Sequence, residues 1–156
     1  MIKKLLFIFS ICIFLFTLFI FYQAFQLKPD IREENLIKID TKKCNLNQEI
    51  CQFYHPGSGN TTLSISPNPI LMNNEIQIRV TTTKDLFETL SIDFLGVDME
   101  MGYNRPLLKK EKKGIYTAIG TLPACTIKKM NWKATLLIKN KEKTYAAQYV
   151  FSTVSK

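Results

Sequence analysis

Residues 5–22 form an apolar run in which no position carries a charge. At 1.5 Å per residue, an α-helix over this run would span roughly 27 Å, close to the thickness of the hydrocarbon core of a bilayer. Lys3 and Lys4 precede the run without any acidic residue, so the positive-inside rule places the N-terminus in the cytoplasm. We expect residues 1–4 to be cytoplasmic, residues 5–23 to form a transmembrane signal anchor, and the following chain to be exported.

A cleaved signal peptide is the alternative interpretation of this run. The apolar region of a signal peptide is about 7–15 residues long and is followed by small residues at the cleavage site. Here the run is longer, and the bulky Tyr22 stands two positions before Ala24, the one candidate small residue. These features favour an uncleaved anchor, although both interpretations place the chain after about residue 28 outside the cytoplasm.

From residue 61 onward, apolar and polar positions alternate with a period of two, which is typical of half-buried β-strands. Turn-forming residues separate the alternating segments, and no soluble helix is indicated. The predicted strands centre on Leu63–Ile65, Ile76–Val80, Leu90–Phe94, Pro106–Lys110, Ile115–Gly120, Trp132–Ile138 and Tyr145–Phe151. Seven short strands predict an all-β fold, namely an immunoglobulin-like antiparallel β-sandwich over residues 61–156, with a small barrel as the alternative. Trp132 is expected in its core.

Residues 24–60 lack this alternation. They are polar and mixed in charge at first, and Pro29 ends any continuation of the anchor helix. Two cysteines, a histidine and two glycines follow. We expect a juxtamembrane stalk and a cysteine-containing loop over this range.

The chain carries a net charge of +8, with lysines concentrated in residues 109–113 and 139–143. Both clusters fall at predicted turns, so solvated hairpin tips are the simplest interpretation and attraction to anionic lipid headgroups is the alternative. An exported domain without a recognition motif is not expected to bind nucleic acid. The chain has one histidine and lacks a nucleophile elbow, a phosphate loop and a Cys-x-x-Cys motif, so we do not expect an enzyme.

Three cysteines, Cys44, Cys51 and Cys125, lie in the part expected to be exported. In an oxidising compartment two of them usually pair. Cys44 and Cys51 are close in sequence and flank a turn-prone stretch, which favours a Cys44–Cys51 disulfide. A Cys51–Cys125 disulfide is the alternative, and either pairing leaves an odd thiol.

Met99 and Met101 lie in a glycine-bounded segment after a predicted strand. In an extended backbone their side chains point to the same side, and two thioethers are soft donors that favour Cu(I). Met130 or Cys125, together with His55, could complete such a site. Ordinary packing of the methionines at the end of the sandwich is the simpler interpretation.

Residues 96–108 (GVDMEMGYNRPLL) and 121–132 (TLPACTIKKMNW), together with the single anchor and short sandwich, resemble small membrane-anchored proteins of the FixH and YtkA-like kind. The resemblance implies a single-pass protein of the bacterial inner membrane with a periplasmic C-terminal domain. It also implies an accessory role in supplying Cu(I) during respiratory oxidase assembly, with the lipid bilayer and a membrane oxidase or copper chaperone as partners. It carries the metal role onto Met99, Met101 and, less directly, Cys125 and Met130.

The alternative function is an anchored interaction module without a metal. Such a module would scaffold another envelope complex through the edge of the sandwich or through the methionine-containing turn.

Overall fold

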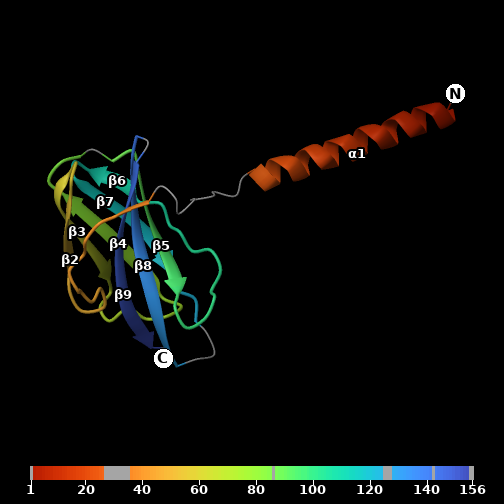
Figure 1. Ribbon diagram of the computed structural model, residues 1–156. Coiled ribbons are helices and arrows are strands. Elements are labelled where there is room, and N and C mark those ends of the chain that lie inside the picture. The colour runs from red at the N-terminus through yellow and green to blue at the C-terminus, as the bar shows by residue number, and fades with distance from the viewer. Residues whose placement is uncertain (1, 27–35, 86, 125–127, 142, 155–156) are drawn as a thin grey trace. The chain divides into compact units, whose positions relative to one another are not determined.

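The computed structural model describes residues 2–26, 36–85, 87–124, 128–141 and 143–154 (Figure 1). The chain divides into two compact units, Met1–Glu33 and Glu34–Lys156. We call the second unit the β-domain.

The first unit contains the helix α1 (Ile2–Gln26). Large apolar side chains between Phe9 and Tyr22 are exposed along it. Among the described residues, no helix combines the length and the apolar character needed to cross a membrane. The transmembrane helix predicted for residues 5–23 is therefore not confirmed.

The β-domain is built from two β-sheets, which is consistent with the predicted β-sandwich. One sheet has the strand order β1-β9-β8-β5, and the other has the order β2-β3-β4-β7-β6 (Figure 1). The strands are β1 (Leu36–Lys38), β2 (Cys51–His55), β3 (Gly59–Ser66), β4 (Glu75–Thr82), β5 (Thr89–Gly96), β6 (Lys109–Lys112), β7 (Ile115–Thr121), β8 (Lys129–Asn140) and β9 (Lys143–Val154).

The longest pairing joins β8 and β9. Their antiparallel register runs without a break from Lys129↔Val154 to Asn140↔Lys143. β5 pairs along the other side of β8, so that Gly96 lies opposite Trp132. The β8–β9 ladder runs the length of its sheet and defines two opposite ends of the β-domain.

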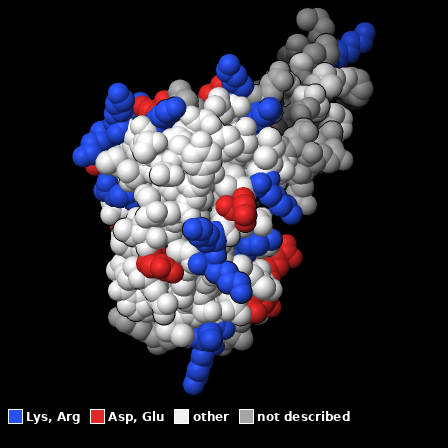
Figure 2. Space-filling view, turned by 60° about the vertical axis from the view of Figure 1, so that its left-hand side comes forward, with Lys and Arg blue, Asp and Glu red and all other residues white. Residues whose placement is uncertain are grey.

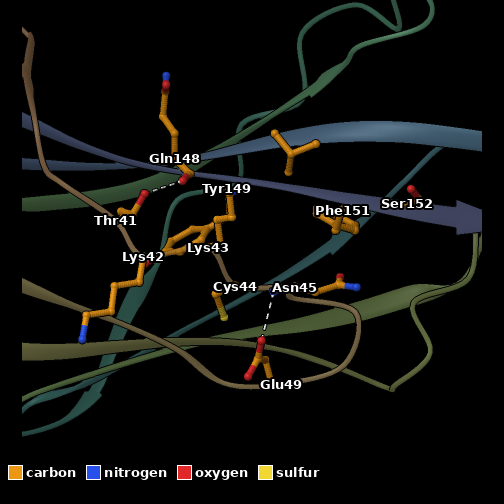
Figure 3. A pocket seen from close by; sticks show the side chains of 11 residues that line it. Thr41, Lys42, Lys43, Cys44, Asn45, Glu49, Gln148, Tyr149, Phe151 and Ser152 are labelled. Carbon is orange, nitrogen blue, oxygen red and sulfur yellow. Dashed lines mark hydrogen bonds between the residues drawn. The ribbon is translucent and has the colours of Figure 1, made fainter.

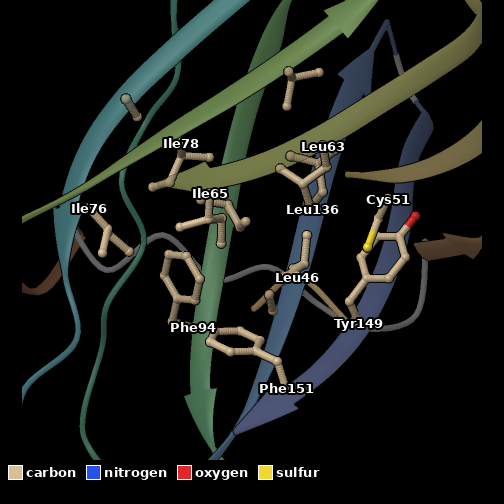
Figure 4. Close-up of a cluster of buried hydrophobic side chains, with 14 of the residues drawn as sticks. Leu46, Cys51, Leu63, Ile65, Ile76, Ile78, Phe94, Leu136, Tyr149 and Phe151 are labelled. Carbon is tan, nitrogen blue, oxygen red and sulfur yellow. The ribbon is translucent and has the colours of Figure 1, made fainter. Parts of the chain in front are cut away.

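The core lies between the inward faces of the two sheets. Figure 4 shows side chains of β3 and β4, such as Ile65 and Ile78, together with Phe94 of β5 and Phe151 of β9. Trp132 is fully buried, as predicted, and its indole N–H donates a hydrogen bond to Thr153 Oγ1 at 2.9 Å. The buried indole therefore keeps a polar partner.

Two strands lie where the sequence predicts a stalk and a loop. β1 pairs in parallel with β9, and β2 pairs in antiparallel fashion with β3. β2 does alternate between buried and exposed positions, but over only five residues, which include a cysteine and a histidine. β1 has three residues, too few to show a period. The sheets therefore begin before residue 61, in contrast to the predicted boundary.

The predicted Cys44–Cys51 disulfide is confirmed, which removes the Cys51–Cys125 alternative. Cys51 is fully buried at the start of β2, and Cys44 packs against the core. The bridge therefore fixes the segment before β2 to the sheet. Cys125 lies outside the described residues.

Reduction of this disulfide should lower the free energy of unfolding by about 2.5 kcal/mol, because the short closed loop restricts the unfolded chain. Urea unfolding of the full-length chain, with and without reductant, measures the difference. The double variant Cys44→Ala/Cys51→Ala is the control, and reductant should not change its stability. Equal stability of the oxidised and reduced parent would contradict the expectation.

Candidate functional site

One candidate site lies where β5 ends beside the start of β8. The backbone N–H of Val97 donates to the carbonyl oxygen of Asn131 at 2.8 Å. The Asp98 carboxylate accepts the backbone N–H of Asn131 at 2.7 Å and its side-chain amide at 3.3 Å. These bonds hold the chain after Gly96 against β8. Sequence reasoning did not identify Asn131, because a polar residue between two buried positions is ordinary in a half-buried strand.

Gly96 is the point at which the methionines converge. A Cβ atom built on Gly96 would lie 3.0 Å from Met101 Cγ and would overlap Met130 Cε and the carbonyl oxygen of Met99. Met130 is fully buried, Met101 is partly buried against the core, and Met99 is 40% exposed. We call Gly96, Met99, Met101 and Met130 the methionine end.

The structure thus brings together part of the predicted ligand set. The side chains of Met101 and Met130 both approach the space beside Gly96, and Met99 belongs to the same short segment. Cys125 lies outside the described residues. Within the described part of the chain, no group of three or more His, Cys, Asp or Glu side chains is placed to hold a metal ion.

His55 lies at the opposite end of the β-domain. Its ring contacts Tyr145, with ring centroids 4.6 Å apart, and Phe87, with centroids 5.5 Å apart. Tyr145 pairs with Ile138 of β8. At 3.3 Å per residue, Ile138 is roughly 26 Å along the strand from Met130. The structure therefore does not bring His55 to the methionine end.

The hydrogen bonds of His55 indicate a structural role. Its Nδ1 atom accepts the backbone N–H groups of Gly57 at 3.2 Å and Ser58 at 3.1 Å. The ring hydrogen of the neutral form is therefore on Nε2, which is buried without a hydrogen-bond partner among the described residues. Burial lowers the pKa of His55 from its ordinary value. The folded chain thus favours neutral imidazole.

A cleft of about 590 Å³ lies beside β9 (Figure 3). Thr41 Oγ1 donates to the carbonyl oxygen of Gln148 at 2.9 Å, and Asn47 Nδ2 donates to that of Ser152 at 3.0 Å. Tyr149 also lines the cleft, and burial raises its pKa to about 12. These side-chain hydrogen bonds cover the part of the β9 edge that the short β1 does not reach. They protect this edge from pairing with strands of other chains.

A charged cluster joins β6 and β7 to the loop after β4. Asp85 accepts a hydrogen bond from Tyr116 and forms an ion pair with Lys110. The hydrogen bonds from Lys110 and then Tyr116 lower the pKa of Asp85. The pKa of Tyr116 is raised to about 12, mainly by burial and secondly by its hydrogen bond to Asp85. The carboxylate of Asp85 and the ammonium group of Lys110 thus neutralise each other, and the cluster links β6 and β7 to the loop after β4.

Comparisons with known proteins give no relative from which a function could be transferred. No protein-family model matches the chain, and neither a curated protein nor a solved structure matches it. The candidate site therefore rests on the chemistry of its own residues.

Gly96→Ala should lower the free energy of unfolding by about 1–3 kcal/mol, because the added methyl group would overlap Met130 and a backbone oxygen. Gly120→Ala is the matched control, since its nearest contacts, at 3.4–3.8 Å, are ordinary ones. It should change stability by less than about 1 kcal/mol. Thermal or urea unfolding measures both. A Gly96→Ala chain as stable as the parent would show that the methionines do not fill this space.

Lowering the pH below 6.5 should destabilise the chain through His55. The pKa of His55 is depressed below its ordinary value of 6.5, so the unfolded state binds the proton first as the pH falls. The stabilisation is complete above pH 6.5 and is lost as the pH falls toward the folded-state pKa. Urea midpoints between pH 7.5 and 5.5 measure this loss. His55→Gln removes the only histidine, so a variant that keeps the same dependence would contradict the assignment.

Proposed function

We propose that this chain is an exported accessory protein that binds Cu(I) at the methionine end and delivers it during assembly of a respiratory oxidase. The proposal rests on the approach of both the Met101 and Met130 side chains to the space beside Gly96. Thioether sulfur is a soft, neutral donor, and soft donors select Cu(I) over harder cations. Met101 and Met130 would hold the ion together with Met99.

The burial of these residues suits a delivery role. Met130 is fully buried, whereas Met99 is 40% exposed. An ion held between them would be shielded from water on one side and reachable by a partner on the other. Thioethers bind without releasing a proton, so Cu(I) affinity should vary little with pH.

The strand order supports an immunoglobulin-like topology. β3-β4-β7-β6 corresponds to the four-stranded sheet of that fold, and β5-β8-β9 corresponds to its three-stranded sheet. The resemblance of the sequence to FixH and YtkA-like proteins implies a domain of this kind.

The disulfide supports export, because disulfides persist in oxidising compartments. Anchoring by residues 5–23 in a bacterial inner membrane, with the β-domain in the periplasm, stays a prediction from the sequence.

An interaction module without metal is the second candidate. Val97, Tyr103 and Leu107 follow β5 in sequence and are each more than half exposed. Leu107 bridges to Ser91 of β5, so part of this apolar surface lies along the outer side of that strand. An exposed apolar surface of this kind favours a protein partner.

Replacing Met99 and Met101 together by leucine should abolish Cu(I) binding. The swap conserves volume, so we expect a stability cost under about 1.5 kcal/mol. Competition for Cu(I) against a chromophoric chelator, with the purified full-length chain, measures the affinity.

Met72→Leu is the matched control for this experiment. Met72 is a buried core methionine, and its side chain is not among the nearest contacts of Gly96. The control should keep the parent affinity. A double variant that binds Cu(I) as tightly as the parent, or a parent that binds none, would favour the interaction module instead.

A further inference from the structure

Three turns meet at the end of the β-domain opposite the methionine end. The backbone N–H of Thr82 donates to the carbonyl oxygen of Gly114 in the β6–β7 turn at 2.8 Å. Two residues further on, the N–H of Lys84 donates to the carbonyl oxygen of Ser58 at 3.1 Å. The N–H of Glu88 donates to the carbonyl oxygen of Lys139, next to the β8–β9 turn, at 3.1 Å. The chain after β4 therefore ties together turns that are distant in sequence.

Lysines gather on the β6–β7 and β8–β9 turns and on the loop after β4. The group comprises Lys84, Lys112, Lys113, Lys139, Lys141 and Lys143, which we call the basic end, and all six are exposed. Within the described part of the chain none of the six forms an ion pair, whereas the nearby Asp85 and Glu111 are paired with Lys110 and Arg79. Figure 2 shows basic side chains projecting from the upper end of the β-domain. Glu88 is the one unpaired carboxylate described beside them, so positive charge dominates.

The N-terminal side of the β-domain adjoins the same end. Leu36, the first residue of β1, pairs with Thr144, the neighbour of Lys143 in β9. The preceding unit contains α1, whose large apolar side chains between Phe9 and Tyr22 are exposed. An apolar helix thus precedes in sequence the strand β1, which begins beside the basic end.

We propose that the basic end docks on the surface of an anionic lipid bilayer. Lysines near such a surface are attracted within about a Debye length, and each adds to binding. An apolar segment and a basic patch together give the two signals that stable attachment to a membrane surface requires. This mode of attachment depends on surface contact and does not need a helix that crosses the bilayer.

Vesicle partitioning of the full-length chain tests the proposal. The variant Lys139→Ser/Lys141→Ser/Lys143→Ser removes half of the basic end. Each lysine should contribute about fivefold, so the partition coefficient onto vesicles containing phosphatidylglycerol should fall about 100-fold. Partitioning onto pure phosphatidylcholine should not change.

The matched control is Lys42→Ser/Lys43→Ser/Lys129→Ser, which removes the same charge away from the basic end. Its partition coefficient should change by less than about tenfold. An equal loss in both triple variants would show that net charge alone drives binding, and this result would overturn the proposal.

If α1 alone holds the chain on both kinds of vesicle, amide hydrogen exchange on the bound chain is the deciding measurement. Amides of residues 82–85, 112–115 and 139–141 should exchange more slowly on phosphatidylglycerol vesicles than on phosphatidylcholine vesicles. High salt and the basic-end variant should abolish the difference, and the control variant should retain it. No difference between the vesicles would overturn the proposal. Equal protection by soluble polyaspartate would also overturn it in favour of an acidic macromolecular partner.

Discussion

The continuous pairing of β8 with β9 is the constraint on which the rest of the β-domain depends. Both strands have 12 residues, and their ladder has no register shift. β5 and β1 pair along its two sides, and the inward face supplies Trp132 and Phe151 to the core. A ladder of this length spans about 40 Å and keeps its two ends well separated. One end carries the methionines, and the other carries the turn with its lysines.

The two proposals together give the β-domain an orientation. Docking of the basic end on a bilayer would direct the methionine end away from the lipid, because the two ends lie at opposite ends of β8. Cu(I) bound there would then be presented to the part of a membrane complex that projects from the bilayer. Delivery requires this accessibility, and the exposure of Met99 is consistent with it.

The main part of the fold follows from patterns that can be read along the chain. The strands β3 to β5 and β7 to β9 fall where apolar and polar residues alternate, because each buries one face against the opposite sheet, whereas all four residues of β6 are exposed. The Cys44–Cys51 bridge follows from sequence proximity and from the compartment expected for the chain.

Features that depend on tertiary pairing could not be predicted in this way. β1 is defined by its parallel pairing with β9, since its three residues have no readable period. His55 is separated from the methionines because the strand termini near them lie at opposite ends of the β-domain. The composition of the chain does not specify which strand termini lie together. The approach of Met130 and Met101 to one space likewise depends on Gly96, whose missing side chain leaves that space open.

X-ray absorption at the copper edge of the Cu(I)-loaded full-length chain tests whether the methionine end binds the ion. We predict a first coordination shell of sulfur alone, lost when Met99 and Met101 are replaced by leucine. A shell containing the imidazole nitrogen of His55, the only histidine in the chain, would contradict it, because the structure places that ring at the opposite end of the β-domain.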